Sequence, residues 1–81
     1  MTILYSDLTF VSGKDMWAVT STGNWSQDNE TGRRFGVELV EYIRDTGETN
    51  TLGSVMNAMI DKGHHCGIEA GFFAVVASAL R

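Results

Sequence analysis

The 81-residue chain contains no proline and a single cysteine, Cys66. One cysteine excludes an intrachain disulfide scaffold, and an unpaired thiol fits a reducing compartment. Because proline is absent, we expect glycine to mark the turns between elements. The longest apolar stretch, 71–77, is far shorter than the ~20 residues of a membrane-spanning helix. With no basic region in residues 1–5 to suggest a signal peptide, we predict a cytoplasmic protein without a membrane partner.

Basic residues are also scarce. Six lysines and arginines face ten acidic residues, which gives a formal net charge of −4. Direct binding of nucleic acid needs a basic face, so we expect none, and the acidic balance favours a protein partner with a basic surface. A hydrophobic content of 43% excludes intrinsic disorder. The length predicts a single domain over residues 1–81.

The N-terminal part of the chain has the alternating pattern of β-strands. Residues 2–12 and 15–22 are rich in β-branched and aromatic types, and both faces of the alternation carry apolar residues. Residues 12–15, Ser-Gly-Lys-Asp, have turn chemistry, with glycine available for positive φ. These features predict an antiparallel β-hairpin.

The remaining chain shows the period of helices. Apolar residues fall on one face over about 30–46 and again from about 51 to 63, where Gly47 and Gly63 are natural stop residues. A third helix is expected over 67–80, apolar almost all round, with a stripe of small residues that permits close backbone approach. The predicted fold is therefore α+β, a two-stranded hairpin followed by three helices, ββααα.

The open edges of a two-stranded hairpin and the surplus apolar surface of the third helix both indicate association. We expect a homodimer in which the sheet continues across a two-fold axis, or else pairing of the sheet edge with a partner protein. The candidate residues of this interface are aromatic or apolar: Tyr5, Phe10, Phe72, Phe73 and Val76.

Three features have the residue types of reactive or ligand-binding sites. His64, His65 and Cys66 are metal-ligand types, but adjacent side chains diverge. The nearest set at helical spacing is Asp61, His65 and Glu69, and glycines at 63 and 67 interrupt the helix between them. The same divergence argues against Cys66 as a nucleophile, so we expect no metal, cofactor or catalytic residue. Arg33 and Arg34 are a possible anion contact, or else they pair with neighbouring glutamates.

Acidic residues concentrate around the first predicted helix, near a tryptophan in a polar loop. Tryptophan is enriched at binding hot spots, although it can also cover the edge of a core. Similarly, an acidic flank is either a solvated face or a complement to a basic groove. The predicted partner interface comprises Trp25, Asp28, Glu30, Glu38, Glu41, Asp45 and Glu48.

In size, acidity and absence of catalytic motifs, the chain resembles small phage-encoded proteins such as the anti-CRISPR proteins. This resemblance implies a non-enzymatic inhibitor that occupies a basic, nucleic-acid-handling surface of a larger complex. It involves no residue pattern, so no family residues carry over. Two alternatives stay open: a structural or assembly subunit that forms a homo-oligomer, and a small-ligand or metal-binding domain.

Overall fold

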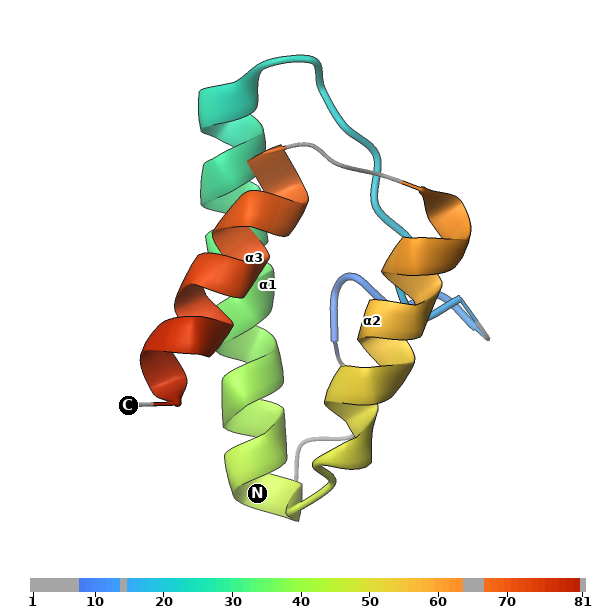
Figure 1. Cartoon of the computed structure of the whole chain (residues 1–81), viewed down its shortest axis with the longest axis vertical. Coiled ribbons are helices and arrows are strands. Elements are labelled where there is room, and N and C mark those ends of the chain that lie inside the picture. The colour runs from blue at the N-terminus through green and yellow to red at the C-terminus, as the bar shows by residue number, and fades with distance from the viewer. Residues whose placement is uncertain (1–7, 14, 64–66, 81) are drawn as a thin grey trace.

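The structure is a computed structural model that describes residues 8–13, 15–63 and 67–80 (Figure 1). It contains helices α1 (Trp25–Thr46), α2 (Asn50–Lys62) and α3 (Gly67–Ala79). Within these ranges there is no strand, so the architecture is all-α. The prediction of an α+β fold with a hairpin was therefore wrong, whereas the prediction of three consecutive helices is confirmed.

Helix α1 begins earlier than its apolar pattern indicates. The Asn24 side chain accepts a hydrogen bond from the backbone N–H of Gln27 at 3.1 Å, which caps the first turn. The predicted start near residue 30 was therefore wrong. The predicted end is confirmed, because Gly47 adopts φ 75° and donates its N–H to the Ile43 carbonyl.

Helices α1 and α3 run in the same direction and pack closely against each other (Figure 1). Glycines of both helices lie at the contact. A Cβ on Gly32 would overlap the Ile68 carbonyl, and one on Gly71 would overlap the Asn29 carbonyl. The close approach expected from the small-residue stripe of α3 is thus confirmed, and α1 supplies matching glycines at 32 and 36.

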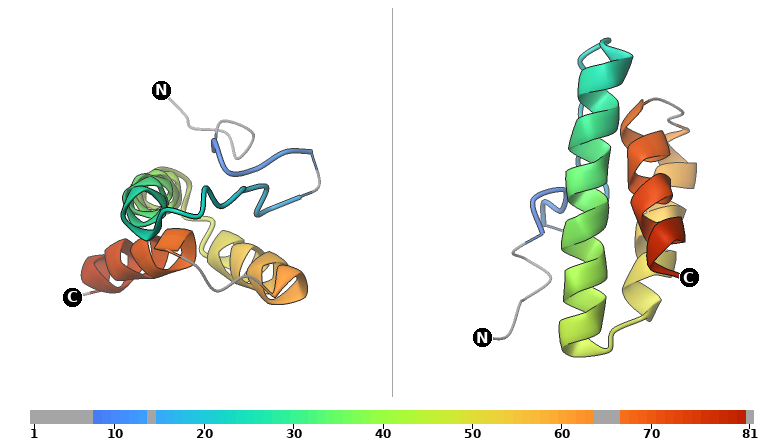
Figure 2. Two further views of the ribbon diagram at one scale, coloured as in Figure 1. Left: turned by 90° about the horizontal axis from the view of Figure 1, so that it is seen from above. Right: turned by 90° about the vertical axis from the view of Figure 1, so that its left-hand side faces the viewer.

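The remaining elements complete a two-layer molecule. Figure 2 shows α2 and α3 in one layer, with α1 and the N-terminal segment in the other. We use "N-terminal segment" for residues 8–24, of which residue 14 is not described. Because α2 stands off from α1 and α3, this segment fills the space between them. It contributes three fully or almost fully buried side chains: Leu8, Phe10 and Trp17.

Aromatic side chains form the centre of the core. The ring centroids of Phe10 and Trp17 lie 5.4 Å apart, and that of Phe72 lies 4.9 Å from Trp17 and 5.9 Å from Phe10. Tilted and edge-on pairs at such distances stabilise one another beyond simple burial. The apolar residues of the predicted hairpin therefore do enter the core, but from an irregular chain.

Side chains explain why the hairpin does not form a ladder. The predicted turn exists, with Gly13 at φ 59° and reciprocal backbone hydrogen bonds between Ser12 and Asp15. Beyond it, the Trp17 N–H, which would pair with Phe10 in a regular ladder, donates to the Asp15 carboxylate at 3.1 Å. The Phe10 carbonyl instead accepts the Ala18 N–H at 2.7 Å, one residue out of register. Regular pairing therefore stops after one bridge, and a two-stranded ribbon is only marginally stable alone.

The length and polarity of the helices decide whether any of them could span a membrane. Among the described residues, α2 and α3 are too short to cross a bilayer, and α1 is too polar.

Candidate protein-binding surface

The seven residues of the predicted partner interface do not form one surface. Glu30, Glu41, Asp45 and Glu48 are exposed, as expected of a binding face. The other three residues, Asp28, Glu38 and Trp25, differ from this group in burial, in bonding or in position.

Asp28 is buried, with 2% of its surface exposed, in the first turns of α1. Its carboxylate accepts hydrogen bonds from the Ser21 hydroxyl at 2.6 Å, the Thr22 hydroxyl at 2.8 Å and the Thr22 N–H at 3.1 Å. These donors, the Ser21 hydroxyl foremost, hold the pKa of Asp28 below its usual value of 3.8. Asp28 therefore fixes the chain that enters α1 and is not available to a partner.

Glu38 also has an internal role. Its carboxylate accepts the backbone N–H of Thr9 at 2.7 Å and the Thr9 hydroxyl at 2.5 Å. The residue is half-buried and ties the N-terminal segment to the middle of α1. A partner that engaged Glu38 would compete with this contact.

Trp25 is 62% exposed at the first residue of α1. It is separated from Glu41 by about 24 Å along the helix axis, at about 1.5 Å per residue. Its carbonyl lies beside Gly67, at the start of α3. The fold therefore does not bring the predicted aromatic anchor, Trp25, next to the acidic residues around Glu41, because the two sites lie far apart on one helix.

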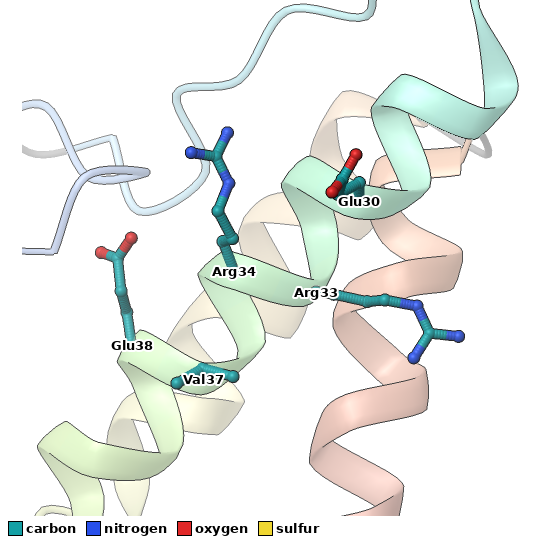
Figure 3. A pocket seen from close by; sticks show the side chains of 5 residues that line it. All are labelled: Glu30, Arg33, Arg34, Val37 and Glu38. Atoms are coloured by element: carbon teal, nitrogen blue, oxygen red, sulfur yellow. The ribbon is translucent and has the colours of Figure 1, made fainter.

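Arg33 and Arg34 do not converge either. Figure 3 shows the two guanidinium groups pointing to opposite sides of α1, around an open, shallow depression. Arg33 donates through Nε to the Asn29 side chain at 2.9 Å. Arg34 lies one helical turn from both Glu30 and Glu38, so carboxylates surround it. This arrangement does not favour an anion site that uses both arginines.

Three acidic residues remain together near the C-terminal end of α1: Glu41, Asp45 and Glu48, here termed the acidic end of α1. All three are exposed. Within the described chain, the Glu41 and Glu48 carboxylates make no hydrogen bond or ion pair. Arg44 is the basic residue in the last turn.

The residues predicted to form the dimer interface also differ in how exposed they are. Phe10 and Phe72 are completely buried in the single chain, and Val76 is 9% exposed, so the fold itself covers these side chains. Phe73 is 40% exposed, on the outer side of α3. Tyr5 lies outside the described residues.

His64, His65 and Cys66 likewise lie outside the described residues. In the part of the chain that is described, no three histidine, cysteine, aspartate or glutamate side chains group as metal ligands would.

One polar contact in the core was not predicted from the sequence. The Trp17 indole N–H donates to the Glu69 carboxylate at 2.7 Å, and Glu69 is 5% exposed. The sequence offered one signal for this contact: Glu69 is the acidic residue of an otherwise uncharged helix. A carboxylate buried with such a helix needs a hydrogen-bond donor. The position of its partner, far away in the sequence, could not be inferred.

Comparison with known proteins adds no relative: no family model, curated protein or solved structure matches the chain.

Proposed function

We propose that this chain is a non-enzymatic binding protein whose acidic end of α1 contacts a basic surface on a larger, nucleic-acid-handling protein. Glu41 and Glu48 carry the proposal, because both are exposed and neither serves the described fold. The proposed location is the cytoplasm, as the single cysteine suggested.

The position of the acidic end is the main support. The C-terminus of a helix carries partial negative charge, so acidic residues there destabilise the helix by typically about 0.3–1 kcal/mol each at exposed sites. Glu48 follows the Gly47 cap of α1 and lies at this negative end, and Glu41 lies about one turn before the last turn. The Glu48 carboxylate therefore acts against the helix end beside it, and binding to a basic surface would account for its position.

The nature of the partner follows from charge. Proteins that bind nucleic acid present clustered lysine and arginine to the phosphate backbone. An exposed helix end with three carboxylates can occupy part of such a surface, and the net charge of −4 favours the encounter. Occupation of that surface would inhibit or modulate nucleic-acid binding by the partner.

The test compares a double variant with a single-site control. Glu41→Gln with Glu48→Gln neutralises the acidic end, and Glu30→Gln removes one equally exposed carboxylate from the other half of α1. Proteins retained from a host extract by the wild type are identified, purified and titrated by calorimetry against each variant. We expect a basic, nucleic-acid-binding protein whose affinity falls at least about tenfold with the double variant only.

Circular dichroism and thermal melts accompany the titrations. The double variant should be as stable as the wild type or slightly more stable, because the unfavourable charges at the helix end are gone. Unchanged affinity in the double variant, or an equal loss in Glu30→Gln, would contradict the proposal. So would direct binding of the wild type to DNA or RNA.

A second function, assembly into a homo-oligomer, is favoured by a separate observation. Ile60 and Leu80 are more than 70% exposed, and Phe73 is 40% exposed. Ile60 lies on α2, Phe73 lies on α3, and Leu80 directly follows the last residue of α3.

A further inference from the structure

The second half of α1 and the last turns of α3 lie side by side and bound a depression with apolar walls, here termed the terminal depression (Figure 1). It is open to solvent and has a volume of about 190 Å³. Residues of α1, of the start of α2 and of the end of α3 meet there. Its apolar walls are Val40, Ile43, Leu52, Val76, Ala79 and Leu80.

The size of the terminal depression suits one side chain better than a cofactor. Pockets for cofactors and drug-sized molecules usually enclose about 300–1,000 Å³. The terminal depression is smaller, and Leu80 on its rim is 79% exposed. Protein interfaces seat their anchoring side chains in such pockets, where the surrounding contacts exclude water. A leucine- or phenylalanine-sized side chain of another protein is therefore the expected occupant.

A second depression adjoins the first and brings a carboxylate to the apolar walls. It shares Val40, Arg44 and Ala79 with the terminal depression, and Glu41 also lines it. The carboxylates of Glu41 and of Glu48, just beyond the helix end, make no hydrogen bond or ion pair within the described chain. Three carboxylates of the acidic end thus stand against Arg44, and this balance favours a basic group beside the apolar side chain.

Other occupants fit the charge less well. A fatty acid brings a carboxylate, which the acidic end of α1 repels. A second copy of this chain brings a net charge of −4 to a surface that is itself acidic. A basic segment with an apolar side chain satisfies both the walls and the charge.

We propose that the terminal depression seats one large apolar side chain of the basic partner, from a segment in which lysine or arginine flanks that side chain. The flanking basic group contacts Glu41, and its aliphatic stem covers part of the apolar wall. Recognition of this segment rests on the proposed function, because Glu41 belongs to the acidic end of α1.

The experiment uses a capped helical peptide about four turns long, with a stripe of leucines flanked by arginines, as the probe. One matched peptide carries alanine in place of leucine, and another carries citrulline, a neutral isostere, in place of arginine. Each is titrated into the isotope-labelled full chain and followed by nuclear magnetic resonance. The leucine–arginine peptide should shift the amides of Val40, Ile43 and Val76, and each matched peptide should bind at least about fivefold more weakly.

Protein variants locate the contact. Leu80→Gln removes an apolar wall at an exposed position, so the variant should fold normally and bind the leucine–arginine peptide at least about fivefold more weakly. Ile60→Gln is the matched control, because Ile60 is 72% exposed on α2 and does not line the terminal depression. Arg44→Gln removes the positive charge beside both depressions and should tighten binding. Circular dichroism verifies that all three variants fold.

The outcomes separate this proposal from the proposed function. Equal binding of the leucine and alanine peptides, with a loss in Glu41→Gln, would overturn the apolar seat and leave the proposed function intact. Equal binding of the arginine and citrulline peptides would contradict the proposed function itself. Equal effects of Leu80→Gln and Ile60→Gln, or no binding of the leucine–arginine peptide, would overturn the proposal. So would weaker binding in Arg44→Gln, which indicates an acidic occupant, or self-association that Leu80→Gln abolishes, which indicates a second copy.

Discussion

The two halves of this molecule are held together by different kinds of contact. Helices α1 and α3 meet closely at glycines, where carbonyl groups of the facing helix and, at Gly36, the Val75 side chain leave no room for a Cβ. By contrast, α2 stands off from both, and Lys62 of α2 pairs with Asp15 of the N-terminal segment. That segment contacts α3 through the Trp17 ring against Phe72 and the indole N–H on Glu69. The first contact depends on shape alone. The second depends partly on charge, so the two halves should respond differently to substitution, pH and salt.

The largest effect is expected at the glycine contact. In Gly32→Ala, the new Cβ would overlap the Ile68 carbonyl, a backbone atom that cannot rotate away. We expect a loss of about 3 kcal/mol or more in the free energy of unfolding, measured by urea denaturation, at the upper end of overpacking costs.

The matched control is Gly53→Ala on α2, where nothing lies within 4 Å of the new atom. There alanine should stabilise the protein by about 0.5–1 kcal/mol through helix propensity. If the two alanines had similar effects, the close packing of α1 against α3 would be wrong.

The second effect concerns the core contact between the N-terminal segment and α3. Trp17→Phe removes the indole N–H that donates to buried Glu69 and leaves space beside Phe10 and Phe72. Loss of a hydrogen bond to a carboxylate together with lost packing should cost about 2–4 kcal/mol.

Trp25→Phe provides the comparison, because Trp25 is 62% exposed. Its substitution should change stability by less than about 0.5 kcal/mol. The same pair separates the tryptophan fluorescence signals: emission from the Trp25→Phe variant reports Trp17 alone and should be blue-shifted in the native state. Red-shifted emission from that variant would show that Trp17 is solvated.

The helices were predictable from sequence because their signals are local. The apolar period over residues 52–60 identified α2, and glycines at 47 and 63 marked helix ends where positive φ is required. The start of α1 was missed because its buried face continues through Asp28, Gly32 and Gly36. None of these is hydrophobic, so no hydropathy pattern could reveal a face that packs by backbone approach.

The hairpin was mispredicted for the opposite reason. The alternation that buries Leu8 and Phe10 is real, but it records burial and not strand pairing. Glu38, which accepts the Thr9 N–H and holds this segment against α1, lies 29 residues away, and such partners cannot be read from local pattern. The same limit applies to the candidate surface. Acidic character was visible in the sequence, whereas the internal roles of Asp28 and Glu38 were not.

A smaller effect is expected from acid on the contacts of the N-terminal segment. The pKa of Asp28 is lowered by the Ser21 hydroxyl and the Thr22 N–H, and that of Asp15 by Lys62 and the Trp17 N–H. Their stabilisation is therefore complete above the unfolded value near 3.8 and is lost as pH falls through the lower folded values.

Unfolding midpoints measured from about pH 6 downward should thus decline below about pH 4. Asp28→Asn, which lacks the charge in both states, should flatten this decline. Glu30→Gln, an exposed position on the same helix, should leave its shape unchanged. An acid limb unaltered by Asp28→Asn would mean that the carboxylate does not hold the entry to α1.

The smallest effect should come from the ion pair at the end of α2. Lys62 Nζ and the Asp15 carboxylate lie 2.8 Å apart with side chains 32% and 39% exposed, so water and salt screen their attraction. Lys62→Met keeps the aliphatic stem and removes the charge, and it should lower the melting temperature slightly in dilute buffer. In about 1 M salt, where the Debye length is about 3 Å, the difference from the wild type should nearly vanish. The Gly32→Ala deficit should persist in the same salt, because steric overlap is not screened. This contrast separates a half of the molecule that is packed by shape from one that is fastened in part by charge.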